Sequence, residues 1–236
     1  MTIKVGILET GNPPPPLQER FGSYSAMVQE LLGPQHEFAT FDVRSGELPA
    51  SAASCAAYVI TGSASGVYDG DSWIDMLKEF VRGASGHSAM VGICFGHQLL
   101  AEAFGGQAIK SPRGWGIGLQ RYDVQERAEW MDDARSIAVP ASHQDQIVKL
   151  PPDARVLGGN DFTPYGIIEY PQRRAMSLQS HPEFTPEYAA ALIELRRSSK
   201  YSNEQADRAL ETLRAPNDRA RVGKWLAQFL RSNVRG

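Results

Sequence analysis

Short apolar segments alternate with amphipathic segments along most of this 236-residue chain. Apolar segments of this kind are typical of strands buried on both faces, and amphipathic ones of the helices that cover them. We therefore expect an α/β fold with a mainly parallel twisted sheet flanked by helices. The expected strands are Ile3–Leu8, Glu37–Val43, Ala57–Ile60, Ser88–Ile93 and Ala175–Gln179, and helical stripes are expected within Phe21–Leu32 and Trp73–Val81.

Two regions interrupt this alternation. Between Gln107 and Tyr170 the pattern changes to short strands with turns, including Gly116–Val124, Ser136–Val139 and Tyr165–Tyr170. Asn12–Pro16 is expected to be non-helical, because its run of prolines favours polyproline geometry. We interpret it as a stiff connector into the first helix, with a partner-docking motif as the alternative.

The chain from about residue 185 onward is expected to be helical. Thr185 and Pro186 suit the start of a helix, and Ser202 to Gln205 matches a capping box. The length suits one domain over residues 1–236, with these helices as a C-terminal extension. A last apolar stripe is expected to pack on the sheet, with partner binding as the alternative; it consists of Val222, Trp225, Leu226, Phe229 and Leu230.

Charge and cysteine content narrow the class of protein. The net charge of −3 and pI of about 6.0 give no indication of nucleic-acid binding, which usually shows a basic patch. The two cysteines, Cys55 and Cys94, do not suggest a disulfide framework. The chain begins with an apolar strand rather than a signal peptide, and no apolar stretch approaches the roughly 20 residues that cross a bilayer. We expect a soluble cytoplasmic protein with no membrane contact.

The segment Gly92–Gly96, with the sequence GICFG, has the pattern of a nucleophile elbow that carries cysteine in place of serine. An apolar run precedes it, and His97–Phe104 has the composition of a helix. Cys94 would therefore lie on a sharp strand-to-helix turn, where the flanking glycines permit close packing. The positive end of the helix dipole would lower the pKa of its thiol. Taken alone, the pentapeptide fits a buried core cysteine equally well.

A second polar segment suits the chemistry of a cysteine nucleophile. Residues 179–184 read QSHPEF, and Pro182 biases His181 toward extended geometry. Side chains two residues apart in an extended chain project similarly, so Glu183 can orient the imidazole of His181 and stabilise its charged form. Without the elbow, a surface turn would be the simpler interpretation.

Three motifs together resemble the class I (triad) glutamine amidotransferase family: CFGHQ from Cys94, SHQD at 142–145 and HPE at 181–183. The resemblance covers roughly Ile3 to Phe184, and the combination is specific. The resemblance implies a flavodoxin-like architecture. Within the family, the chain is similar to a stand-alone, GMP-synthase-like glutaminase domain. The resemblance also implies that Cys94 is the nucleophile, His181 the proton shuttle and Glu183 its orienting partner, with no cofactor and no metal.

The resemblance further implies an oxyanion hole and a substrate pocket. One oxyanion donor is expected to be the amide of Phe95, and the second that of Gly62 or Ser63. Many family members carry two glycines and a proline where this chain has Gly62-Ser63-Ala64. The residues expected to bind substrate are Gln98, His143, Gln144 and Asp145. A metal site at His143 and Asp145 is an alternative, although no ligand spacing is characteristic.

The implied reaction is hydrolysis of the glutamine side-chain amide through a cysteine thioester, giving glutamate and ammonia for a partner synthetase on a separate chain. The alternative is a γ-glutamyl peptide hydrolase with the same triad. In that case loop 61–70, with Tyr68 and Asp69, is expected to shape the leaving-group side. A non-catalytic regulatory module is a third interpretation, against which the intact triad argues. The sequence does not identify the ammonia acceptor, the partner or the oligomeric state.

Overall fold

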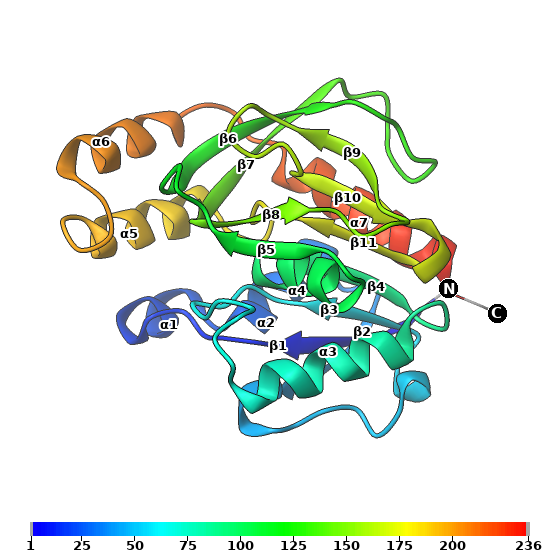
Figure 1. The fold of residues 1–236 in the computed structure, drawn as a ribbon. Helices are drawn as coiled ribbons and strands as arrows, with labels where there is room; N and C mark the ends of the chain where they lie inside the picture. The colour runs from blue at the N-terminus through cyan, green and yellow to red at the C-terminus, as the bar shows by residue number, and fades with distance from the viewer. Residues whose placement is uncertain (1, 235–236) are drawn as a thin grey trace.

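The computed structural model describes residues 2–234, which form a twisted nine-stranded sheet (Figure 1). The strand order is β2-β1-β3-β4-β11-β10-β9-β6-β7. A separate antiparallel pair consists of β5 (Gln107–Lys110) and β8 (Asp145–Lys149). The strands of the large sheet are β1 (Lys4–Glu9), β2 (Glu37–Asp42), β3 (Ala57–Ile60), β4 (Ala89–Ile93), β6 (Gly116–Val124), β7 (Ser136–His143), β9 (Arg155–Gly159), β10 (Ile167–Tyr170) and β11 (Ala175–Leu178).

Five adjacent strands, from β2 to β11 in the sheet order, run parallel to one another. The remaining four strands extend this sheet with antiparallel pairs. This arrangement confirms the predicted α/β class. The region that the sequence set apart, residues 107–170, supplies the antiparallel extension and the small sheet. Parallel strands need long crossovers, whereas antiparallel ones can be joined by the short turns seen in that region.

Helices cover both faces of the parallel strands (Figure 1). On one face α2 and α7 pack against Val5, Val59 and Val91, and on the other α3 and α4 pack against Leu8 and Ile60. Alternate residues of each strand therefore enter two different cores. The helices are α1 (Pro15–Phe21), α2 (Tyr24–Leu32), α3 (Ser72–Ala84), α4 (Phe95–Ala103), α5 (Pro186–Arg196), α6 (Asn203–Thr212) and α7 (Arg219–Asn233), with short 3₁₀ turns at Val43–Ser45, Ala52–Ser54 and Pro171–Arg173.

The N-terminal helices differ from the prediction in two respects. Pro15 and Pro16 form the first turn of α1, so the polyproline interpretation of Asn12–Pro16 is wrong at its end. Proline is compatible with this position because the first N–H groups of a helix have no helical acceptor. The predicted helical stripe from Phe21 to Leu32 is also divided, since Gly22 has a φ of 79° and ends α1 before α2 begins.

Strand β7 is longer than predicted. It continues past Val139 to His143 and pairs with β6 along its whole length. The predicted strand ended just before Pro140, but β7 lies at the edge of the sheet, where a proline disrupts fewer hydrogen bonds. The extension carries the SHQD segment to the end of the sheet at which β4 and β11 also finish.

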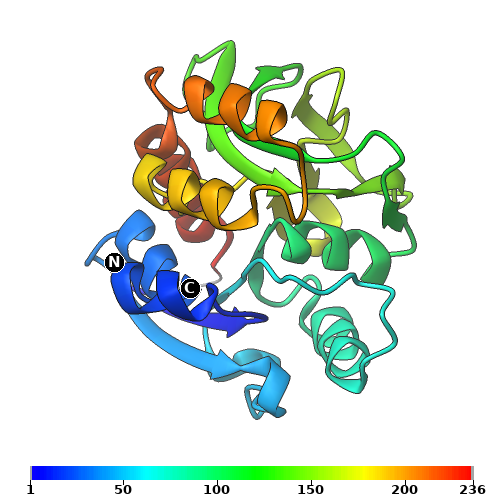
Figure 2. The ribbon, with the colours of Figure 1, turned by 90° about the vertical axis from the view of Figure 1, so that its left-hand side faces the viewer.

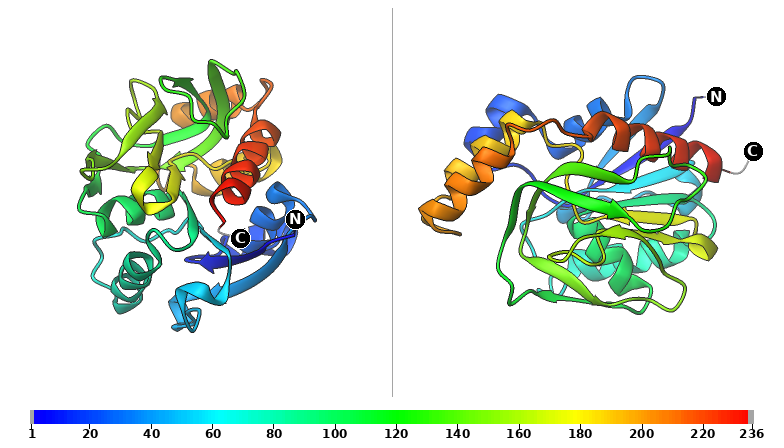
Figure 3. Two further views of the ribbon diagram at one scale, coloured as in Figure 1. Left: turned by 90° about the vertical axis from the view of Figure 1, so that its right-hand side faces the viewer. Right: turned by 90° about the horizontal axis from the view of Figure 1, so that it is seen from above.

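The C-terminal helices occupy two positions. The apolar stripe of α7 is buried against α2 and the sheet, as predicted for a packing element. Helices α5 and α6 pack against each other beside β6, and α5 also packs against α1, at one end of the molecule (Figures 2 and 3). Within residues 2–234, no helix combines the length and apolar character needed to cross a membrane.

Candidate active site

Cys94 lies at the carboxyl end of β4, directly before α4, at an edge of the sheet where parallel α/β proteins commonly bind ligands. Its φ of 53° and ψ of −98° are rarely adopted by a residue with a side chain. Both neighbouring glycines are needed because other backbone atoms lie too close for a side chain. A Cβ on Gly92 would collide with the carbonyl of Gly96, and a Cβ on Gly96 would collide with the carbonyl of Ile60. The backbone therefore has the strained geometry of a nucleophile elbow.

His181 and Glu183 lie beside Cys94, on the chain that leaves β11. Nδ1 of His181 and Oε1 of Glu183 are 2.7 Å apart, and both side chains are buried. Since Nδ1 donates to the carboxylate, Nε2 is the ring nitrogen that remains to interact with the nearby Cys94. The structure thus brings together the three residues predicted as a triad, in the order sulfur, imidazole and carboxylate.

Contacts from distant elements hold this segment in place. The N–H of His181 donates to the carbonyl of Pro140 on β7 at 2.8 Å. Arg219, at the start of α7, donates from Nε to the carbonyl of Pro182 at 2.9 Å and from Nη2 to that of Glu183 at 3.1 Å. Sequence reasoning missed Arg219, because nothing local marks an arginine that binds backbone 36 residues away.

The charges of the site favour a protonated His181. Burial alone would lower the pKa of His181, but the adjacent Cys94 sulfur and Glu183 carboxylate stabilise the imidazolium and raise it to about 10. The arrangement therefore places a protonated imidazole beside the Cys94 sulfur at neutral pH.

Gln179 adds a hydrogen-bond donor to the sulfur. Its Nε2 lies 3.7 Å from Sγ of Cys94, and its Oε1 accepts from Nε2 of Gln98 at 3.3 Å. The side chain is wholly buried, so the interaction is shielded from solvent. Gln179 was part of the quoted QSHPEF motif, but the sequence assigned it no role because its position opposite the elbow depends on the pairing of β11 with β4.

The loop after β3 faces the triad. Gly62 lies so close to His181 that an added Cβ would be 2.8 Å from Cε1 of the imidazole. Thr10 fixes the loop, since its hydroxyl donates to the carbonyls of Thr61 at 2.9 Å and Gly62 at 3.1 Å. Among the described residues, no protein group accepts a hydrogen bond from the N–H of Gly62 or Ser63. These amides are therefore available to a ligand. That they form an oxyanion hole with the amide of Phe95, at the first position of α4, stays a prediction.

The residues predicted to bind substrate gather on the other side of Cys94. Nε2 of Gln98 donates to the carbonyl of Asp145 at 2.9 Å, which ties α4 to the SHQD segment. The Tyr68 hydroxyl donates to Oδ2 of Asp145 at 2.7 Å. Loop 61–70 therefore contacts the SHQD segment. That this loop, with Tyr68 and Asp69, shapes the leaving-group side stays a prediction. Burial raises the pKa of the Asp145 carboxyl, while Tyr68 and Lys110 oppose this shift.

Two further histidines, His143 and His97, are buried and hydrogen-bonded to neighbouring protein groups. Burial lowers the pKa of His143 to about 3, a trend that the nearby His181 reinforces. Nδ1 of His143 donates to the carbonyl of Asp145 at 3.2 Å, so the ring orders the SHQD turn in its neutral form. Nδ1 of His97 is 2.7 Å from the Ser177 hydroxyl, and burial lowers the pKa of His97 to about 3. The described residues contain no cluster of potential metal ligands, so nothing in them supports the alternative metal site at His143 and Asp145.

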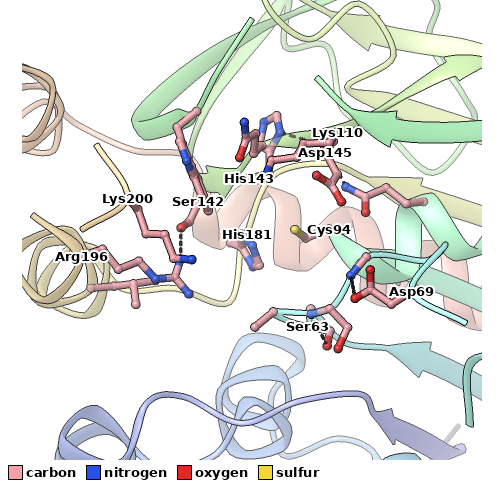
Figure 4. A pocket seen from close by; sticks show the side chains of 18 of the residues that line it. Ser63, Asp69, Cys94, Lys110, Ser142, His143, Asp145, His181, Arg196 and Lys200 are labelled. Atoms are coloured by element: carbon pink, nitrogen blue, oxygen red, sulfur yellow. Dashed lines mark hydrogen bonds between the residues drawn. The ribbon is translucent and has the colours of Figure 1, made fainter. Parts of the chain in front are cut away.

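A cleft of about 360 Å³ connects these groups (Figure 4). This volume falls in the range of sites for small molecules. In Figure 4, Lys110 and Asp145 lie above Cys94, and Ser63 and Asp69 lie below it. Arg196, at the end of α5, and Lys200, after it, lie beyond His181. Nothing in the sequence indicated this part of the cleft, because α5 reaches it through packing against distant elements, among them α1, β6 and β7.

The chain is similar to known proteins along most of its length. The family model for class I glutamine amidotransferases matches residues 35–195. A glutamine amidotransferase-like protein of Schizosaccharomyces pombe is 27% identical over 98% of this chain and 99% of its own. Gamma-glutamyl peptidase 2 of Arabidopsis thaliana is 26% identical over 80% of this chain and 79% of its own. A glutamine-hydrolyzing GMP synthase subunit of Archaeoglobus fulgidus is 33% identical, but over only 40% of this chain and 51% of its own.

A solved structure supports the same fold. A glutamine amidotransferase from Thermotoga maritima aligns with a TM-score of 0.75 over 100% of both chains, at 18% identity. At that identity the likeness concerns the fold alone. The family model, however, spans well over half of the sequence and includes Cys94, His181 and Glu183. The chain therefore belongs to the class I glutamine amidotransferase family.

Proposed function

We propose that this protein hydrolyses the side-chain amide of glutamine and related γ-glutamyl amides through a thioester on Cys94. The observation that carries the proposal is the buried contact series from Cys94 through His181 to Glu183, on a strained elbow. A thiol, an imidazole and an orienting carboxylate in this order are the groups that nucleophilic acyl transfer requires.

In the first half-reaction, Sγ of Cys94 attacks the γ-carboxamide carbon, and the carbon–nitrogen bond breaks. His181 delivers its proton to the departing nitrogen, so that ammonia or an amine leaves uncharged. The negative charge that develops on the carbonyl oxygen falls near the amides of Phe95 and of Gly62 or Ser63. Removing one such donor typically costs about 10²–10³ in rate.

In the second half-reaction, water attacks the γ-glutamyl thioester. His181, now neutral, takes a proton from this water, and the carbon–sulfur bond breaks to release glutamate and restore the thiolate. Glu183 keeps the imidazole in one orientation and stabilises its charged form through both steps. The acidic Asp69 and Asp145 and the basic Lys110 provide opposite charges for the ammonium and carboxylate of the glutamyl group.

A γ-glutamyl peptide hydrolase is the second candidate. The cleft continues beyond His181 to α5, which leaves space for an amine larger than ammonia. The similarity to a γ-glutamyl peptidase also covers a larger share of this chain than that to a GMP synthase subunit. If the protein is instead a glutaminase, a synthetase on a separate chain would consume the ammonia. The name of the Archaeoglobus fulgidus relative, which is one subunit of a GMP synthase, suggests such a division for that protein.

Purified protein assayed against glutamine and a panel of γ-glutamyl amides tests the proposal. We expect release of glutamate together with ammonia or the amine, and a γ-glutamyl adduct on Cys94 in rapidly quenched samples analysed by mass spectrometry. The Cys94→Ala variant serves as the control and should show neither. Turnover that persists in Cys94→Ala would exclude the thioester mechanism.

A further inference from the structure

The far side of the cleft contains two cations, Arg196 and Lys200. Arg196, in the last turn of α5, is partly buried and donates from Nη1 to the Ser142 hydroxyl at 3.0 Å. Its guanidinium carbon also lies 5.9 Å from the centre of the Trp115 ring. Lys200 follows on the exposed turn after α5. Within residues 2–234, neither side chain forms an ion pair with a carboxylate, although both line the cleft.

Arg196 differs from the next residue, Arg197, in its partners. Arg197 does not line the cleft and pairs with both Glu194 and Asp207. Arg196 lines the cleft and contacts a hydroxyl and an aromatic ring instead. These two contacts orient the guanidinium while leaving Nε and Nη2 without a protein acceptor among the described residues. A planar fork held in this way matches a carboxylate, to which arginine can donate two parallel hydrogen bonds.

The chemistry of the triad defines which part of a substrate reaches these cations. His181 protonates the departing nitrogen, so the leaving amine must lie on the His181 side of the sulfur. Figure 4 shows His181 between Cys94 and the Arg196–Lys200 pair, whereas Asp145 and Lys110 lie on the opposite side. A glutamyl group bound near Asp145 therefore directs the substituent on its γ-nitrogen toward Arg196 and Lys200.

We propose that Arg196 and Lys200 form a subsite for the carboxylate of the leaving amine, so that the preferred substrate is a γ-glutamyl amide of an amino acid or short peptide. The inference rests on the proposed γ-glutamyl amide hydrolysis and names its substrate class. The same bonds form and break as in the hydrolysis of glutamine. The thioester forms as the amide bond breaks, and the proton of His181 goes to the amino group of the released amino acid. Free glutamine, whose leaving group is ammonia, cannot use the subsite.

The test compares γ-glutamylalanine with γ-glutamylalaninamide, which differ in the charge of the leaving group. We expect kcat/KM to be about 10- to 100-fold higher for the acid, because a hydrogen-bonded ion pair of this type contributes by that order. The ratio should fall toward one in Arg196→Gln and decrease in Lys200→Gln. Lys200→Glu should favour γ-glutamylethylenediamine, whose leaving group carries a second amine that is positively charged. Because Lys200 is exposed, its variants test the proposal even if Arg196→Gln folds poorly.

Two surface variants serve as controls. Lys224→Gln on α7 and Arg214→Gln after α6 each remove one exposed cation away from the cleft and should keep the wild-type ratio. Equal kcat/KM for the acid and the amide in the wild-type protein would overturn the subsite while leaving γ-glutamyl hydrolysis intact. Failure to hydrolyse glutamine and both γ-glutamyl compounds, with no adduct on Cys94, would instead overturn the proposed function and the subsite together.

Discussion

The imidazole of His181 lies face to face with the ring of Phe184, with ring centroids 3.9 Å apart and planes inclined by 7°. Phe184 is held in turn by Tyr24 and Tyr188, whose rings contact it from α2 and α5. Stacking fixes the plane of the imidazole, and the hydrogen bond to Glu183 fixes its rotation within that plane. An aromatic cluster in the core therefore determines how the imidazole of His181 is oriented.

Cys94 should be the residue that reacts covalently. A glutamine analogue carrying a diazoketone is expected to add one equivalent to Cys94, because only this thiol lines the cleft and faces His181. Burial raises the pKa of Cys55, which disfavours its thiolate. Peptide mass spectrometry locates the adduct, and Cys55→Ala should label like the wild type. An adduct on Cys55 with Cys94 unmodified would refute the assignment.

His181 and Glu183 should differ in the size of their effects. We expect His181→Asn to reduce kcat by about 10²–10⁴, the usual contribution of general acid–base catalysis. Glu183→Gln should reduce it less, because the glutamine still accepts a hydrogen bond but carries no charge. Steady-state kinetics with glutamine measure both. Loss of thioester formation in His143→Asn but not in His181→Asn would assign the proton shuttle to the other histidine.

The alkaline limit of activity should report on His181. Its pKa is raised from the ordinary value of 6.5 to about 10, so the proton required by the leaving group is present at neutral pH and lost as the pH rises through about 10. Glu183→Gln removes one of the charges that raise this pKa. The alkaline limb of kcat/KM should therefore move to lower pH in that variant. An unchanged limb would mean that another group controls it.

Gly62→Ala should impair activity more than stability. The new Cβ would lie 2.8 Å from Cε1 of His181, so the imidazole or the oxyanion loop must shift. We expect kcat/KM to fall by about tenfold or more, by analogy with the loss of one oxyanion donor. Gly83→Ala is the matched control, because a Cβ there meets no atom and the residue lies within helix α3. Equal activity of the two variants would show that the loop tolerates the displacement.

Helix α7 should contribute to the stability of the fold. Leu226 is almost fully buried against the sheet, and Leu226→Ala should lower the free energy of unfolding by about 2–5 kcal/mol. Truncation before Pro216 should have a larger effect, because it removes the whole stripe and Arg219. Thermal unfolding measures both, with the exposed Lys224→Gln as control. An unchanged Tm after truncation, with loss of a partner in pull-downs, would favour the docking interpretation.

The local properties of the chain were sufficient to predict most of the strands and helices, and the motifs indicated Cys94, His181 and Glu183, which the structure brings together. Alternating apolar segments indicated the strands, and the glycines around Cys94 indicated the elbow because backbone packing excludes a Cβ there. His181 and Glu183 were recognisable because their contact spans only two residues. Predictions failed where local and tertiary preferences compete, as at Pro15, which fits the first turn of a helix, and Pro140, which is tolerated in an edge strand.

Tertiary structure alone decided which distant groups surround the triad. Gln179 reaches the sulfur because β11 pairs with β4, Arg219 reaches the Pro182–Glu183 backbone because α7 packs on the sheet, and Arg196 reaches the cleft because α5 lies beside β7. Each contact joins segments separated by tens of residues and carries no periodic signal in the sequence. The three residues proposed to break the amide bond thus lie in short motifs, whereas the groups around them depend on how whole elements pack.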